Sequence, residues 1–418
     1  MKAHGNKQSQ LGTSWGCFLV AAVLILIGSG AFAQGQSITG SPRLESIPLH
    51  GNTLDNVMAE SASGLTVPLF GQGIRSPRDG QRYWTTIMGG QFDPTQFTHQ
   101  TTTVPLVLIP LVVHINGTVF DPTQTAYGPP PSCPSVGVPV TLTQNSPLFQ
   151  NVPYTWNGNY VGTTQYIDAF QRGEFWNDLG ILECSSNGNA GGGGILDEQT
   201  GSGNDTMCWR GGTTDWHTRF AVTTTAAQDF YPSAGGVGSN GCAQVGAVDY
   251  SELQTYIENT LLPNLHVSPT TFPVILMENV FAATNSFKTC CILGFHGAYG
   301  SPMQVYAVAE FDTRSYFGAT TADVSDLSHE LAEAVNDPTG LNPTPAWGHI
   351  GQVSGCQNNL EVGDPLTGTL MPGITLGGFT YHLQELAFYS WFMGTQDGMS
   401  GWYSSNGTFT ANAGAVCH

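Results

Sequence analysis

Residues 323–335, DVSDLSHELAEAV, constrain the fold of this chain more than any other stretch. An Asp or Ser can cap the start of a helix here, acidic residues follow in the first turn, and Leu and Ala fill the interior. Pro338 ends the stretch. The sequence therefore predicts a helix that Leu327, Leu331 and Val335 anchor to a core. Only 10% of the chain is charged, yet residues 326–338 hold two Asp, two Glu and a His. This concentration indicates either the solvated face of an ordinary helix or a functional site.

The residues before this helix predict further regular elements. Residues 249–263 predict a helix with Ser251 as its cap, and the apolar runs 272–281 and 303–311 predict buried strands. The glycine-containing stretch 288–300 between the two runs indicates a turn-rich excursion. This order of elements predicts an α+β fold, with a mixed sheet beside the acidic helix in residues 240–418.

The first half of the chain predicts less order. Residues 34–100, rich in Gly, Ser, Thr and Gln, indicate a loosely structured leader, and residues 101–239 indicate a β-rich portion. Within the latter, residues 103–115 predict a strand whose two prolines suggest an edge or a break, and residues 136–144 predict another strand. Residues 163–176 predict a helix behind a Thr cap.

The N-terminus predicts export. Lys2 and Lys7 precede an apolar run over residues 17–27, and Ala31-Phe32-Ala33 forms an A-x-A cleavage pattern, so residues 1–33 are expected to be a signal peptide. The run is shorter than the roughly 20 residues of a membrane span, which favours a secreted or periplasmic protein without stable membrane insertion over an uncleaved anchor.

Cysteine content and charge bound the partners. Eight of the nine cysteines follow the signal, an even number that favours disulfides in an exported chain. The net charge of −19 becomes more negative once the two signal lysines are removed, which argues against nucleic acid and anionic membranes as partners. The sequence leaves the oligomeric state open.

Within the predicted helix, His329 and Glu333 are four residues apart and share a face, with Glu330 beside the histidine. This arrangement resembles the HExxH helix of zincin metallopeptidases, in which two histidines bind zinc and the glutamate activates a water molecule. The sequence departs from that motif because Glu333 replaces the second histidine, giving HExxE. A carboxylate ligand makes the site more anionic and shifts its preference towards harder cations.

The resemblance extends to the segment GCQNNLEVGDP. Gluzincin-type members take a third ligand from a later glutamate, which implies Glu361 here, and Asp364 would orient the first histidine. Asp337, one turn after Glu333, is the competing third ligand. His349 could stabilise an oxyanion, although a loop histidine bonded to backbone is the simpler interpretation. His296 and Tyr299 could line the cleft, or be exposed side chains of glycine-rich turns.

The resemblance implies a zincin-like core and a secreted zinc-dependent peptidase that cleaves peptides or proteins with Glu330 as general base. The alternative is a catalytically silent exported binding protein whose acidic helix holds Ca²⁺ or another divalent cation. Tryptophans within residues 209–217 leave a carbohydrate-active protein as a third hypothesis. No GxSxG motif is present, which removes that serine-hydrolase class. Residues 272–417 also resemble a group of uncharacterised exported bacterial proteins, a resemblance that implies no activity.

Overall fold

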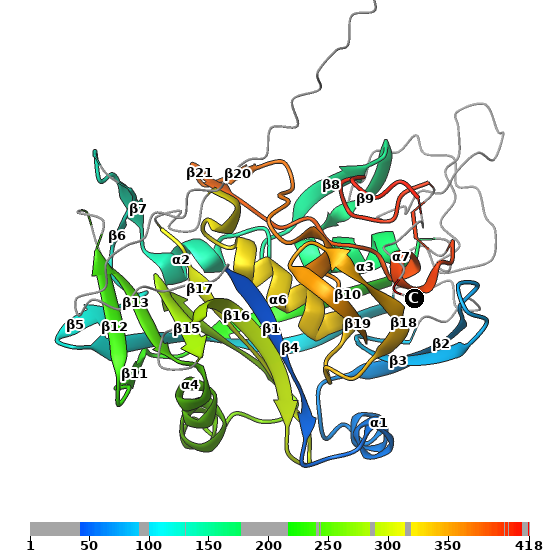
Figure 1. The fold of residues 1–418 in the computed structure, drawn as a ribbon, viewed down its shortest axis with the longest axis horizontal. Helices are drawn as coiled ribbons and strands as arrows, with labels where there is room; N and C mark the ends of the chain where they lie inside the picture. Colours follow the sequence, from blue (N-terminus) through cyan, green and yellow to red (C-terminus); the bar gives the residue numbers. More distant parts are fainter. Residues whose placement is uncertain are drawn as a thin grey trace, which may run out of the picture.

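Figure 1 shows the computed structural model of the chain, in which one large curved sheet dominates. The described residues are 42–91, 100–129, 131–176, 216–239, 242, 244–284, 289–313, 319–396, 398–399, 401–411 and 417. The expected signal peptide and most of the tryptophan-containing stretch 209–217 lie outside them. Among the described residues, no helix is both long enough and apolar enough to cross a membrane.

Eleven strands form the large sheet, which mixes parallel and antiparallel pairs and is nearly barrel-shaped. Its main path runs through β10 (Trp216–Thr224), β4 (Gln100–Ile115), β14 (Phe272–Glu278), β17 (Gln304–Phe311), β16 (Thr289–Tyr299), β15 (Val280–Thr284), β13 (Gln244–Asp249) and β12 (Gly235–Ser239). Off this path, β1 (Arg43–His50) pairs with β16, while β5 (Thr118–Phe120) and β11 (Gln228–Phe230) pair with β4. Because β4 pairs directly with β14, the expected boundary near residue 240 falls inside one sheet.

Smaller elements surround this sheet. Two-stranded pairs are β2 (Leu69–Arg75) with β3 (Arg82–Met88), β6 (Ala126–Tyr127) with β7 (Ser135–Gly137), β8 (Val152–Trp156) with β9 (Asn159–Thr164), β18 (Pro343–Ile350) with β19 (Val353–Asn359), and β20 (Ile374–Leu376) with β21 (Phe379–Tyr381). The helices are α1 (Leu54–Ala62), α2 (Pro139–Gln144), α3 (Tyr166–Glu174), α4 (Tyr250–Tyr256), α5 (Leu262–Asn264), α6 (Ser325–Asn336) and α7 (Tyr389–Met393). A π-helical turn, Ile257–Leu261, joins α4 to α5.

The expected α+β zincin-like fold is wrong. Strands make up 44% and helices 20% of the described residues, and the sheet is far larger than the predicted mixed sheet. Two segments cause the difference. The expected excursion is the long strand β16, and the expected loose leader supplies β1, α1, β2 and β3.

Two glycines explain why the sequence did not predict β16 as a strand. Its Gly294 and Gly297 resemble turn residues, but both lie inside the strand. A Cβ at Gly294 would lie 2.8 Å from Glu330 Cγ, and a Cβ at Gly297 would lie 2.8 Å from Ile47 Cβ. These glycines therefore allow α6 and β1 to approach the backbone of β16 closely.

Other local predictions are confirmed or corrected by the structure. The helices over residues 163–176 and 249–263 and the strands over 272–281 and 303–311 are present as α3, α4–α5, β14 and β17. The proline-containing strand is neither an edge nor broken, because β4 pairs with β10 on one side and β14 on the other, and each proline removes only one donor. Residues 136–144 are mostly helix α2, since Pro139 suits a first helical turn.

Two caps differ from the predictions. Asp249, and not Ser251, caps α4 by accepting a hydrogen bond from the Glu252 N–H. Helix α6 has Val324 at its N-cap position without a side-chain cap, and the Asp323 carboxylate accepts the Val324 N–H instead. Both helices are nevertheless fixed at their starts by an aspartate.

Disulfides are present, as the cysteine count predicted. Cys133 bonds to Cys242, and Cys356 on β19 bonds to Cys417 near the C-terminus. The second bond ties the C-terminal end of the chain to the β18–β19 hairpin.

Candidate metal centre

Helix α6 is buried along its whole length between the sheet and surrounding loops. Its apolar side packs in the main core, and it contacts β16, β17, β1 and β3. On its polar side, His329 and Glu330 are 0% exposed and Glu333 is 1% exposed. The interpretation as a solvated helix face is therefore excluded.

The first group of possible ligands consists of His329, Glu333 and Asp364. His329 Nε2 lies 2.9 Å from Glu333 Oε1 and 3.6 Å from Asp364 Oδ1, yet it has no hydrogen-bond partner. Ligand atoms around a tetrahedral zinc with bonds near 2.1 Å lie roughly 3.4 Å apart. These separations therefore suit one shared cation, and Asp364, expected to orient the histidine, is in the same group of possible ligands as His329.

Neighbouring groups hold His329 in position. Its Nδ1 lies 3.1 Å from Gln384 Oε1, and Gln384 Nε2 donates to the Gly363 carbonyl at 2.7 Å. The Gly363 N–H in turn donates to Glu333 Oε1 at 3.1 Å. A proton on Nδ1 leaves the Nε2 lone pair free for a cation, as in many metal sites whose second ring nitrogen is hydrogen-bonded.

The second group consists of His296, Glu333 and Glu361. His296 comes from β16, its Nδ1 lies 3.6 Å from Glu333 Oε2, and its Nε2 lies 3.9 Å from Glu361 Oε2. Ser46 on β1 and Asn359 on β19 both donate hydrogen bonds to the other oxygen of Glu361. Glu361, the expected third ligand, is thus grouped with His296 rather than with His329.

Glu330 lies beside both histidines. Its Oε2 lies 3.1 Å from His296 Nδ1, and its Oε1 has no hydrogen-bond partner. Gly294 provides the space for its side chain. One oxygen of Glu330 is therefore hydrogen-bonded to His296, and the other is buried without a hydrogen-bond partner.

Four buried atoms around this centre lack hydrogen-bond partners. They are His296 Nε2, His329 Nε2, Glu330 Oε1 and Glu361 Oε2. Buried polar atoms in folded proteins are normally satisfied, because each unsatisfied one costs about 1–3 kcal/mol. All four atoms can bind or face a cation, and imidazole together with carboxylate suits Zn²⁺, Mn²⁺ or Fe²⁺.

Ionisation at the centre is strongly shifted. Burial raises the pKa values of Glu330, Glu333 and Glu361 above the ordinary carboxyl range. Burial lowers the pKa of His296 to about 3, and the charge of His329 adds to this effect. Burial alone would lower the pKa of His329, but the carboxylates of Glu333, Asp364 and Glu330 together outweigh it and raise that pKa well above 6.5. Without a cation the cluster retains protons, which an incoming ion must displace.

A cavity of about 320 Å³ reaches this centre from the surface. Glu333, Glu361 and Asp364 line it, together with β1 and β19 residues such as Ser46 and Gln357. Gln352 and Gln357 both donate to the Asp364 carboxylate. No motif in the sequence marks these glutamines as part of the site. The one local signal is that Gln357, Asn359 and Glu361 are spaced two apart, as residues on one face of a strand are.

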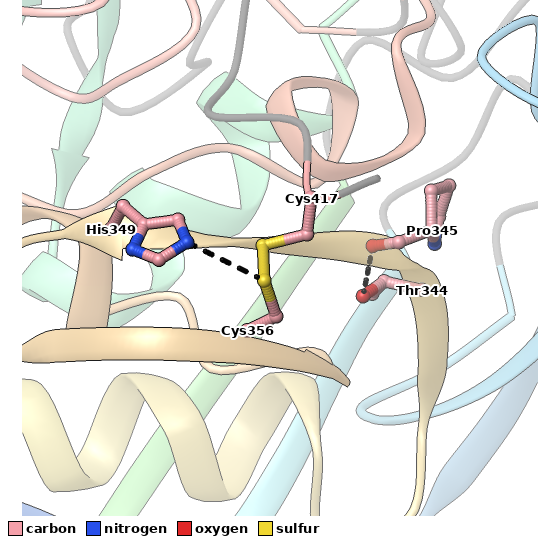
Figure 2. The surroundings of a disulfide bond; sticks show 5 residues. All are labelled: Thr344, Pro345, His349, Cys356 and Cys417. Carbon is pink, nitrogen blue, oxygen red and sulfur yellow. Dashed lines mark hydrogen bonds between the residues drawn. A yellow bond between two sulfur atoms is a disulfide. The ribbon is translucent and has the colours of Figure 1, made fainter.

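The remaining predicted site residues lie elsewhere. His349 is exposed, with its Nε2 3.6 Å from Cys356 Sγ, and Figure 2 shows it beside the Cys356–Cys417 disulfide. Both sulfur atoms are bonded to each other, so this trio offers no thiolate to a metal. Tyr299 stacks on His50 and packs against Tyr306. Neither His349 nor Tyr299 is among the residues that line the cavity at the metal centre.

Asp337 closes the turn after α6 and belongs to neither ligand group. Its carboxylate accepts hydrogen bonds from the Leu341 and Asn342 N–H groups and from Thr339 Oγ1. These donors occupy both oxygens. The competing third ligand thus closes the turn after α6 and, unlike Asp364, is in neither group of possible ligands.

Burial raises the pKa of Asp337 to about 7. A carboxyl group whose pKa is higher in the folded than in the unfolded protein binds its proton more tightly in the folded state. The resulting stabilisation is complete at a pH below the pKa of the unfolded state, and it is lost as the pH rises through the pKa of the folded state. Between about pH 4 and pH 7, Asp337 should therefore lower the free energy of unfolding by on the order of 4 kcal/mol. We expect this pH-dependent decrease to be absent in Asp337→Asn, because asparagine does not titrate. Urea unfolding of both proteins in excess chelator at pH 4, 5.5 and 7 measures the slope. Identical slopes would contradict the prediction.

Comparison with protein-family models, curated proteins and solved structures finds no match for this chain. The resemblance to zincins therefore rests on the motif residues alone. What the structure contributes is a buried set of two imidazoles and three carboxylates, with Glu330 next to it, at the inner end of a cavity.

Proposed function

We propose that this chain is an exported metal-dependent hydrolase that cleaves peptide bonds. The observation that carries the proposal is the group His329, Glu333 and Asp364, whose facing atoms are buried, close enough to share one cation and reached by the cavity. The disulfides support a location outside the cytoplasm, secreted or periplasmic.

The residues around the cation have distinct roles in this proposal. A bound zinc ion would polarise the scissile carbonyl and lower the pKa of a water molecule. Glu330 would take the proton of that water on its free Oε1 and return it to the leaving amine. His296 holds the other oxygen of Glu330, so that the carboxylate keeps one orientation.

The cavity walls favour a polar, extended substrate. Hydroxyl and amide side chains from β1, β19 and the turn between β18 and β19 line the cavity, including Ser46, Gln352 and Asn359. These side chains already hydrogen-bond to Glu361, Asp364 and the Leu44 carbonyl, and they give the cavity a polar wall that suits the backbone of a peptide better than an apolar ligand. A peptide or protein substrate is therefore the favoured class.

One observation favours the alternative, a catalytically silent cation-binding protein. Glu333, Glu361 and Asp364 line the cavity, but Glu330 and His329 are not among its lining residues. A substrate in the cavity as it stands would thus meet the ligands before the base. The two histidines argue against Ca²⁺ in either case, because Ca²⁺ takes oxygen ligands.

Metal analysis and a proteolysis assay test the proposal. The chain without residues 1–33 is purified, its bound metals are measured by mass spectrometry, and cleavage of casein is followed with and without chelator. We expect bound zinc or another transition metal, cleavage that stops with chelator, and recovery when the metal is returned. Cleavage that survives complete metal removal would overturn the mechanism, and bound metal without any cleavage would favour the silent alternative.

A further inference from the structure

We infer that the centre is built for two divalent cations, with the Glu333 carboxylate bridging them. The inference deepens the proposed function and rests on its metal centre. One ion would be held by His329, Glu333 and Asp364, and the second by His296, Glu333 and Glu361.

The position of Glu333 between the histidines carries the first step. Its Oε1 lies 2.9 Å from His329 Nε2, while its Oε2 lies on the side of His296, 3.6 Å from Nδ1. Because Nδ1 is hydrogen-bonded to Glu330, Nε2 is the nitrogen of His296 that is left for the second ion. Each carboxylate oxygen therefore faces a different imidazole. A carboxylate that presents one oxygen to each of two ions is a common bridge where the ions lie about 3.5–4 Å apart.

The composition of the two groups carries the second step. Atoms bonded to one ion at about 2.0–2.2 Å lie within about 4.4 Å of one another. Each group satisfies this approximately, with all its ligand atoms within 4.8 Å. Among the described residues, no such group contains both His296 and His329, and Glu333 is the only member that the two groups share. A single ion would thus leave one imidazole unused.

Unsatisfied atoms point to the second ion in particular. His296 Nε2 and Glu361 Oε2 face each other at 3.9 Å, and neither has a hydrogen-bond partner. His296 is 0% exposed and Glu361 is 2% exposed, so water in the cavity reaches neither side chain freely. An ion between them would satisfy both atoms.

The charge of the cluster is compatible with two ions. Glu330, Glu333, Glu361 and Asp364 carry four negative charges when ionised, and Arg43, which lines the same cavity, pairs with Glu45 at 2.5 Å. Within the described residues, the only ion-pair partners of the four carboxylates are His296 and His329. One divalent ion would balance two of these four charges, and two ions would balance all four.

Binding of Mn²⁺ alone tests the inference. The metal-depleted chain without residues 1–33 is equilibrated with Mn²⁺, and bound manganese is counted and examined by electron paramagnetic resonance. We expect about two ions per chain and an exchange-coupled spectrum, because ions about 4 Å apart interact magnetically. His296→Ala should reduce the count to about one ion and restore the spectrum of an isolated Mn²⁺.

A matched control is His114→Ala, which removes a histidine of β4 that pairs with Asp229 away from the centre and should keep two coupled ions. If His296→Ala does not fold, the spectrum of the unaltered chain decides. One isolated ion in the unaltered chain would overturn the bridge, while chelator-sensitive cleavage would still support the proposed function. No bound ion of any kind would overturn both.

Discussion

Replacing Glu330 by glutamine is expected to lower kcat for peptide hydrolysis by about 10²–10⁴-fold, the usual contribution of a general base. Glutamine keeps the size of the side chain and can accept the hydrogen bond that His296 Nδ1 offers to Oε2 at 3.1 Å. It cannot take a proton from water. Because Glu330 belongs to neither ligand group, the amount of bound metal should stay the same.

Kinetics with a fluorogenic peptide, together with metal analysis of the same samples, check this expectation. Glu252→Gln is the matched control, since Glu252 lies on α4 and bonds to Ser233 far from the cavity lining. It should retain full activity. Unchanged kcat in Glu330→Gln would remove Glu330 as the base, and loss of metal in that variant would instead make Glu330 a ligand.

Local sequence patterns predicted those elements in which the order of apolar residues directly reflects burial. Helix α6 was predicted correctly because its apolar residues recur at helical spacing, and β14 and β17 because buried strands are continuous apolar runs. Strand β16 was not, since its glycines are required by neighbours that are distant in sequence, namely Glu330 and Ile47. The fold class was wrong for the same reason: strand pairing of β1 with β16 joins segments about 250 residues apart and leaves no local signal.

The candidate site was predictable only in part. The structure places Glu333 and Asp364 in one group of possible ligands with His329, whereas Glu361, the third ligand that the motif implied, is grouped with His296. The spacing could not assign Glu361 and Asp364 to different groups. His296 was expected only to line a cleft, since its strand was not recognised. The supporting amides Gln352, Gln357 and Gln384 act through tertiary contacts, which single-residue patterns do not encode.

The effect of Gly363→Ala on metal binding is the sharpest test of His329. The backbone of Gly363 has φ −85° and ψ −33°, which alanine adopts without strain. An added Cβ, however, would lie 2.4 Å from His329 Nδ1 and 2.5 Å from its Cγ and Cε1. Contacts this short do not occur, so either the backbone or the imidazole ring must move.

Neither can move without breaking part of the centre. The Gly363 N–H donates to Glu333 and its carbonyl accepts from Gln384, so the backbone is fixed on both sides. The ring is fully buried and bonded to the same Gln384. We therefore expect Gly363→Ala to weaken metal binding by about 10–100-fold, as loss of ligand orientation does elsewhere, and to cost about 1–3 kcal/mol of stability through overpacking.

Gly355→Ala provides the comparison. Gly355 lines the same cavity on β19, but a Cβ there meets no atom within 4 Å. Its metal affinity, measured by competition with a coloured chelator, should equal that of the unaltered chain. If the two alanine variants bound metal equally well, His329 would tolerate displacement, and an imidazole that can be displaced without cost is not holding the ion. The assignment of the first ligand group would then fail, whatever the chain hydrolyses.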